Sequence, residues 1–312
     1  MEIINGVVIP SALAVLLSLL LCPLSARVSR VTGAIDQPDG VRKINTIPIP
    51  RLGGLGFFTA FFIAVTPLLP SGERAIYALL CGGAVIVAAG VADDTYSISP
   101  ALKLIMQIAA AAVGVSIMGI PEEYSFFGLF SISPPAVLSF IIATVRIVFS
   151  INAVNFCDGL DGLATGLSSV ALLAVSAFAL SYGKAEISAI SVILFFSLLG
   201  FLPYNRHPAR IYMGDSGSQF LGLAIAMLAL GARGDRNFAI ETIFFLSIPM
   251  LDTWFSVTRR IFSGKNPFSA DKGHLHHLLL KKGLSHSAAV KLLVCISGII
   301  AAGALAIIDK AV

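Results

Sequence analysis

Charged residues are scarce in this chain. Of its 312 residues, 12% are Asp, Glu, Lys or Arg and 57% are hydrophobic. Soluble domains carry roughly 25% charged residues, so the composition excludes an ordinary soluble protein and indicates an integral membrane protein. The mean hydropathy of +0.92 agrees with this interpretation. The formal net charge of +4 is small and gives no indication of a nucleic-acid partner.

Paired cysteines, linkers and low-complexity tracts are also lacking. The four cysteines lie in or near apolar runs and form no CxxC pair, which favours small buried residues over a disulfide or metal role. No stretch resembles a separate soluble domain, so residues 1–312 are expected to form a single transmembrane domain. Only Glu2 precedes the first apolar run, and the absence of a cationic segment there favours a retained helix over a cleaved signal peptide.

Long apolar runs are what the chain has in abundance. A helix that crosses a bilayer needs about 20 apolar residues. The runs predict an all-α, polytopic membrane protein with about ten transmembrane helices, at residues 3–22, 53–70, 74–92, 101–119, 135–151, 163–182, 186–202, 217–231, 239–257 and 288–308. The eighth run is short, so we expect it to tilt or to be partly buried within the bundle.

Basic residues favour one set of loops. The connections after the odd-numbered runs hold fourteen Lys and Arg, whereas the other loops and the termini hold five. By the positive-inside rule the richer set faces the cytoplasm and both termini face outward. The loops expected to carry the active site are therefore cytoplasmic, namely 23–52, 93–103, 152–162, 203–216 and 258–287.

Carboxylates recur where apolar runs end. An ionised carboxylate in or beside a bilayer costs at least a few kcal/mol, so such residues indicate function. The six aspartates concerned all fall on the predicted cytoplasmic face, and they are Asp93, Asp94, Asp158, Asp161, Asp215 and Asp252. We therefore expect the chemistry to take place at that face.

The densest polar stretch reads NAVNFCDGLDGLATG, residues 152–166. On a continuous helix the i,i+3 spacing of Asn155, Asp158 and Asp161 would place them on one face. The glycines that follow favour instead a break in the helix, with backbone close to a ligand. Either arrangement predicts a functional site, because packing between apolar spans does not require this many polar residues.

The segment after Asp93 and Asp94 starts a new helix. Ser99 and Pro100 are typical of an N-cap followed by proline at the first helical position. Lys103 in the first turn is unfavourable to the helix dipole, which suggests a contact with phosphate. A solvated turn with one snorkelling lysine is the alternative.

Asp215 lies between small residues in the segment YMGDSG. Oxygen ligands from Asp and Asn suit a hard cation such as Mg²⁺, which bridges phosphates. Tyr212 in the same segment could stack on a base, or could be an interfacial belt tyrosine.

Histidines cluster in the segment GHLHHLL. No cysteine lies nearby, and Asp271 is the one adjacent carboxylate, so zinc binding is less favoured than an anion-binding cluster. That cluster would consist of His274, His276 and His277 with Arg259, Arg260 and Lys272. A surface loop with chance histidines is the alternative. His207 and His286 stand alone and receive no role, and Arg42, Lys43 and Arg51 are interpreted as leaflet anchors or lipid-phosphate contacts.

Taken together, these motifs resemble the polyprenyl-phosphate N-acetylhexosamine-1-phosphate transferase family. The matching stretches are DQPDGVRK (36–43), PRLGG (50–54), DDTYSISPALK (93–103), NAVNFCDGLDGLATG (152–166), YMGDSGS (212–218) and PFSADKGHLHHLL (267–279). The last stretch resembles the branch that uses N-acetylglucosamine rather than the muramoyl-pentapeptide branch. Asn45 departs from the family pattern, in which histidine is common.

The resemblance implies a reaction and its partners. The family transfers a sugar-1-phosphate from a UDP-sugar to a polyprenyl phosphate, here expected to be undecaprenyl phosphate, and releases UMP. The lipid-linked product starts cell-envelope polysaccharide synthesis, including lipopolysaccharide. The implied sugar is N-acetylglucosamine or a related N-acetylhexosamine, and the implied location is the bacterial cytoplasmic membrane. The oligomeric state stays open, a homodimer included.

The resemblance also implies residue roles. Asn155 and Asp215 would hold Mg²⁺, with Mn²⁺ as an alternative. The implied catalytic residues are Asp93, Asp94, Asp158, Asp161 and Lys103, of which Asp158 and Asp161 would order the nucleotide pocket. Tyr212 would stack on uracil. The remaining substrate contacts would come from Asn152, His274, His276, His277, Arg260 and Arg51.

Two other functions are compatible with intramembrane aspartates: an aspartyl protease and an ion-coupled transporter. A protease needs two aspartates at mid-bilayer depth, and transporters often show inverted repeats with midplane sites. The aspartates of this chain lie at run ends beside Asn, Lys and His, which favours phosphate chemistry. For the transfer we expect direct attack by the lipid phosphate rather than a phospho-enzyme, with the lipid tail in a groove beside runs 3–5 and 8–9.

Overall fold

The computed structural model describes residues 4–38, 47–126, 129–234, 237–264 and 273–308. Within these ranges seven helices are long and apolar enough to cross a membrane. They are α1 (Ile9–Thr32), α3 (Arg74–Tyr96), α4 (Pro100–Met118), α5 (Ala136–Cys157), α6 (Leu163–Ser181), α7 (Ala185–Asn205) and α11 (His286–Ile308). The helical, polytopic membrane fold is thereby confirmed, whereas the count of about ten spans stays a prediction. Arg42, Lys43 and Asn45 lie outside the described residues.

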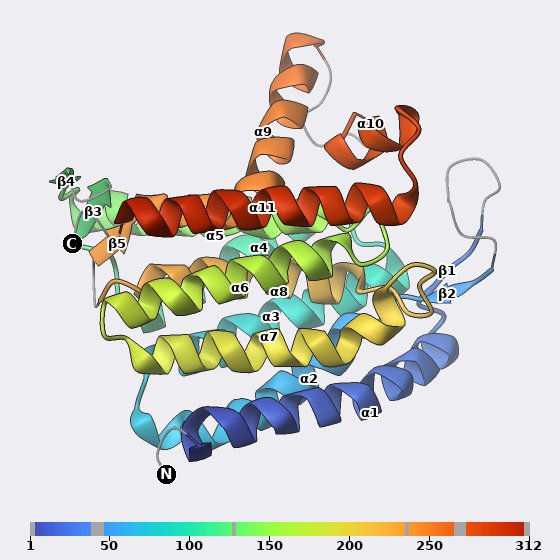
Figure 1. Cartoon of the computed structure of the whole chain (residues 1–312), viewed down its shortest axis with the longest axis horizontal. Helices are drawn as coiled ribbons and strands as arrows, with labels where there is room; N and C mark the ends of the chain where they lie inside the picture. The colour runs from blue at the N-terminus through green and yellow to red at the C-terminus, as the bar shows by residue number, and fades with distance from the viewer. Residues whose placement is uncertain (1–3, 39–46, 127–128, 235–236, 265–272, 309–312) are drawn as a thin grey trace.

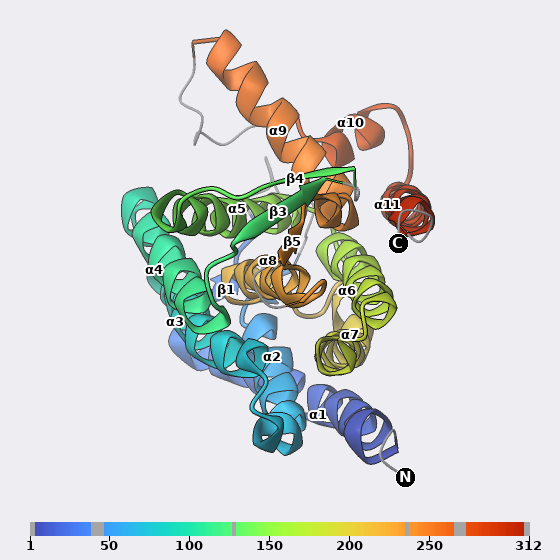
Figure 2. The same cartoon turned by 90° about the vertical axis from the view of Figure 1, so that its left-hand side faces the viewer.

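Helix α8 (Gly214–Gly231) forms the centre of the bundle, as Figure 2 shows. Every residue from Ser216 to Leu230 is buried, in agreement with a helix that is apolar on all sides. Helix α2 (Gly53–Val65) packs beside it and passes into a 3₁₀ turn (Thr66–Ser71). The short eighth run is therefore enclosed by the other helices, as the sequence suggested.

The ninth run forms no single helix. Residues 237–262 form β5 (Asn237–Ala239), a 3₁₀ helix (Ile240–Leu246) and α9 (Ser247–Phe262). Pro249 fits the first turn of a helix but not its interior, so α9 begins just before it. The prediction of one span over 239–257 is wrong for this reason. Helix α9 projects out of the bundle, crosswise to the other helices (Figure 1).

Two small sheets cover the ends of the bundle, and the sequence analysis predicted neither. Strands β1 (Ile35–Asp36) and β2 (Ile49–Pro50) pair antiparallel at one end. At the other end the strand order is β4 (Phe130–Ile132), β3 (Glu123–Phe126), β5, with β3 antiparallel to β4 and parallel to β5. Helix α10 (Leu275–Lys281) is the short helix expected within 258–287. Both chain ends lie at the end opposite β1 and β2 (Figure 1).

Glycines allow three helices to meet where α8 begins. A Cβ atom on Gly54 of α2 would overlap the backbone of Gly217, and one on Gly90 of α3 would overlap the backbone of Ser216. Small residues permit this close approach of helices inside a membrane. Because backbone packs directly on backbone, the first turn of α8, which carries Asp215, has little freedom to move.

Candidate active site

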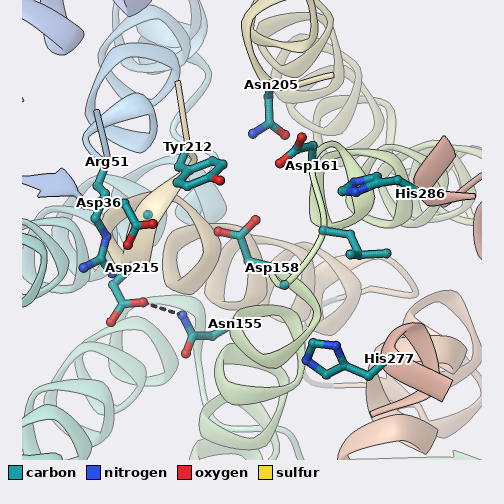
Figure 3. Close-up of a pocket in the computed structure, with 13 residues that line it drawn as sticks. Asp36, Arg51, Asn155, Asp158, Asp161, Asn205, Tyr212, Asp215, His277 and His286 are labelled. Atoms are coloured by element: carbon teal, nitrogen blue, oxygen red, sulfur yellow. Dashed lines mark hydrogen bonds between the residues drawn. The ribbon is translucent and has the colours of Figure 1, made fainter. Parts of the chain in front are cut away.

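A cavity of about 320 Å³ opens at the end of the bundle that carries β1 and β2. Its polar lining comprises Asp36, Arg51, Asn155, Asp158, Asp161, Asn205, Tyr212, Asp215, His277 and His286 (Figure 3). Seven of these residues were predicted from sequence: Arg51, Asn155, Asp158, Asp161, Tyr212, Asp215 and His277. Among the described lining residues, four carboxylates face a single arginine, so the cavity suits a cation.

Asp94 fixes the start of α8 rather than lining the cavity. Its two carboxylate oxygens accept hydrogen bonds from the backbone amides of Asp215 (3.0 Å) and Ser216 (3.1 Å). The guanidinium of Arg51 lies 3.3 Å from the same carboxylate, whose side chain is fully buried. A carboxylate at a helix N-terminus is favoured by the helix dipole. Asp94 thereby places Asp215 at the cavity, and its predicted catalytic role stays a prediction.

Lys103 joins two carboxylates behind the cavity. Its ammonium lies 2.9 Å from Asp93 Oδ2 and also contacts Asp215 Oδ2. The other oxygen of Asp93 accepts a hydrogen bond from the backbone amide of Ile98, at 2.9 Å. The predicted helix start is confirmed, because Ser99 Oγ accepts a hydrogen bond from the amide of Leu102. Lys103 therefore does not snorkel, because it forms ion pairs with both acids, and its predicted contact with phosphate stays a prediction.

The polar stretch after α5 is broken, as its glycines suggested. Helix α5 ends at Cys157, and Gly162 takes a positive φ of 77° before α6 begins. The break turns Asp158 and Asp161 toward the cavity (Figure 3). Asn155, still on α5, donates its amide hydrogens to Asp215 Oδ1 and Ser218 Oγ, each at 2.8 Å.

Asn152 lies one turn before Asn155 and does not line the cavity. Its amide nitrogen donates to Gln107 Oε1 and to the carbonyl of Val148, both at 2.8 Å. Gln107 in turn donates to Gln219 Oε1 of α8, at 3.0 Å. Asn152 thus belongs to an amide network that ties α4, α5 and α8 together, so the structure gives its predicted substrate contact no support.

Negative charge accumulates in the cavity. The pKa of Asp158 is raised well above its ordinary value, first by burial and then by the charges of Asp215 and Asp94. Burial and the neighbouring acids Asp161 and Asp36 likewise raise the pKa of Tyr212. A bound cation would relieve this repulsion, since an opposite charge favours the ionised form of each acid.

The predicted histidine cluster divides into separate environments. His274 Nδ1 pairs with Asp252 Oδ2 at 2.9 Å, and Asp252 Oδ1 accepts from the backbone amide of Leu275 at 2.8 Å. His276 packs against Gly159, where a Cβ atom would overlap its ring. Burial and the charge of His277 lower the pKa of His276 to about 4, so it is neutral near pH 7.

Of the three clustered histidines, His277 is the one that lines the cavity. Arg260 is buried with its guanidinium 5.8 Å from the ring centre of Phe156. The cavity lining therefore does not include His274, His276 or Arg260. The sequence analysis had grouped these residues with His277 as one set of substrate contacts. Asp252 and His274 instead hold the start of α10, the helix that presents His277.

Sequence reasoning missed Asp36, Asn205 and His286, which also line the cavity. It also missed His207, whose Nδ1 lies 2.7 Å from Asp161 Oδ2. Asn205 is held by Thr165 Oγ1, which donates to its amide oxygen at 2.7 Å. The sequence analysis did assign the 203–216 loop to the active site, and this loop holds both Asn205 and His207. Their position in that loop was the one signal that could have identified them.

Comparison with known proteins identifies the family. Residues 76–233 match the model of glycosyl transferase family 4. A probable undecaprenyl-phosphate N-acetylglucosaminyl 1-phosphate transferase of Bacillus subtilis is 36% identical over 91% of this chain and 80% of its own length. A decaprenyl-phosphate N-acetylglucosaminephosphotransferase of Mycobacterium leprae is 37% identical, over 84% and 74%. An undecaprenyl-phosphate alpha-N-acetylglucosaminyl 1-phosphate transferase of Escherichia coli is 28% identical, over 88% and 77%. The chain therefore belongs to glycosyl transferase family 4.

Proposed function

We propose that this bacterial multi-pass membrane protein transfers N-acetylglucosamine-1-phosphate, or a related N-acetylhexosamine-1-phosphate, from a UDP-sugar to undecaprenyl phosphate. UMP is the second product. The observation that carries the proposal is an acid-rich cavity at one end of an apolar bundle, in a chain similar to polyprenyl-phosphate transferases. Such a position lets a lipid tail stay in the bilayer while its phosphate meets a soluble nucleotide. The cavity faces the cytoplasm, where the positive-inside rule places its loops.

The donor occupies the cavity with its uracil against Tyr212. The Tyr212 ring lies on the same wall as Asp36 and Arg51, and Asp158 lies between this wall and Asp161 (Figure 3). Arg51 lines the cavity from that wall and supplies positive charge for the pyrophosphate. His277 supplies a hydrogen-bond donor from the opposite side.

Asn155 and Asp215 would hold Mg²⁺, with Mn²⁺ as a substitute. The residues fit such an ion, because they offer hard oxygen ligands and the surrounding carboxylates outnumber the bases. When bound, the ion neutralises pyrophosphate charge. Asp93 and Lys103 hold Asp215 from behind, and Asp94 holds the backbone that carries it.

In the transfer, an oxygen of the lipid phosphate attacks the β-phosphorus of the donor, and the bond to the UMP oxygen breaks. A phosphate monoester has a second pKa of about 6 and is largely dianionic near pH 7, so it needs little help from a base. Positioning and charge neutralisation therefore supply most of the catalysis. Asp93 or Asp94 orients the acceptor. Neither a protease nor a transporter is favoured for a chain of this family.

The proposal is tested by UMP release from a panel of UDP-sugars. Purified protein is supplied with undecaprenyl phosphate and Mg²⁺, and reactions without the lipid serve as controls. We expect lipid-dependent UMP release with UDP-N-acetylglucosamine or another UDP-N-acetylhexosamine. UMP release that does not require the lipid would contradict the proposal, and so would inactivity with every donor in a protein that is folded.

A further inference from the structure

Three donor side chains from separate segments of the chain converge beside the cavity. Asp161 comes from the turn between α5 and α6, His207 from the α7–α8 connection and His286 from the first residue of α11. One ligand atom from each lies within 4.8 Å of the other two. We refer to these residues as the 161–207–286 cluster. The proposed transfer reaction uses neither histidine.

The surroundings of the His286 ring suit a ligand. The rings of His207 and His286 are stacked, with centres 4.0 Å apart and planes 15° apart. Neither ring nitrogen of His286 has a hydrogen-bond partner among the described residues, although both nitrogens are buried. Buried polar atoms without a partner are unfavourable and are rare in folded proteins. A metal ion that takes the lone pair of one of these nitrogens would remove half of this defect.

The geometry points to a binding site for a divalent transition metal, with Zn²⁺ as the best match. Two imidazoles and one carboxylate are ligands that zinc accepts, and a fourth position stays open for water or a substrate oxygen. Mg²⁺ prefers oxygen ligands, so this site differs in chemistry from the one at Asn155 and Asp215. Zinc at about 2.0–2.2 Å from its ligands spaces them roughly 3.3 Å apart, so the His207 and His286 rings would turn out of their stack to direct one nitrogen each at the ion.

Zinc at this cluster would connect three segments of the active site. Asp161 Oδ2 already accepts hydrogen bonds from the backbone amide of Ala209 (3.1 Å), and it pairs with His207. Asp161 and His286 both line the cavity, so the ion would lie at its wall.

The inference is tested by metal content, which does not depend on the transfer reaction. Protein purified without a polyhistidine tag is equilibrated with Zn²⁺ in excess Mg²⁺, then analysed by elemental mass spectrometry. Co²⁺ in place of zinc reports tetrahedral geometry through its visible absorption. We expect about one equivalent per chain, with affinity lowered roughly tenfold or more in His207→Gln and in His286→Gln.

His277→Gln is the matched control, because His277 lines the same cavity but lies outside the 161–207–286 cluster. Thermal unfolding of all three variants establishes that they are folded. Zinc retained by His277→Gln and lost from the other two supports the site. Zinc absent from the wild type, or lost equally from all three variants, would overturn it. If His207→Gln and His286→Gln do not fold, zinc content is measured in Asp161→Asn instead. Loss of zinc from that variant supports the site, and retained zinc overturns it.

Discussion

Asp94→Asn probes how the active site is positioned. In the native protein each carboxylate oxygen of Asp94 accepts one backbone amide from the start of α8. Asparagine keeps the size but supplies one oxygen, and its NH₂ group would face the second amide. A hydrogen bond to a charged group contributes about 1.5–3 kcal/mol. Losing one such bond should therefore cost roughly 1.5–3 kcal/mol in the placement of Asp215, equivalent to a fall in kcat of about 10- to 150-fold.

The assay is UMP release at saturating donor and acceptor over a range of Mg²⁺ concentrations. We expect the Mg²⁺ requirement of Asp94→Asn to rise while the KM for the UDP-sugar changes less, because Asp94 acts through Asp215. Glu73→Gln is the control, since Glu73 caps the other end of the same helix by accepting from the amide of Ala75. Wild-type kcat and Mg²⁺ dependence in a folded Asp94→Asn variant would refute the reasoning.

Three further predictions concern single residues. Asp215→Ala and Asn155→Ala should each abolish UMP release without loss of folding, and activity retained in both would remove them from the metal site. The folded protein raises the pKa of Asp158, so the stability from this group is complete below its unfolded pKa and is lost as pH rises through the raised folded pKa. Asp158→Asn should accordingly lessen the fall of the melting temperature with rising pH in Mg²⁺-free solution, whereas an unchanged slope would argue against the raised pKa. Asp252→Asn should lower kcat/KM by roughly 10- to 100-fold, through loss of a charged hydrogen bond that holds α10 and His277, and near-native kinetics would show that this support is dispensable.

Local signals in the sequence predicted much of the fold. Apolar runs located the seven long helices, and Ser99 with Pro100 marked the start of α4. The glycines after Asp158 indicated the break between α5 and α6. Each of these features depends on a few neighbouring residues, and capping or backbone freedom decides it.

Contacts between residues far apart in the chain could not be predicted from the sequence. Asp94 meets the α8 backbone more than 100 positions away, and His207 meets Asp161 across 46 positions. Such pairings depend on the rotation and tilt of whole helices, which an apolar run does not determine. For the same reason the sequence grouped His274, His276 and His277, although α10 and Asp252 place just one of them at the cavity.

Following the donor's β-phosphate tests the central claim most directly. Wild-type protein is given undecaprenyl phosphate, Mg²⁺ and UDP-N-acetylglucosamine labelled with ³²P at the β-position, and the label is traced in lipid, nucleotide and protein. We expect the label to enter the lipid in step with UMP formation, with none bound to protein, and no transfer by Asp215→Asn. Label retained in released UDP would show that the sugar moves without its phosphate, and that result would contradict phosphoryl transfer at this site.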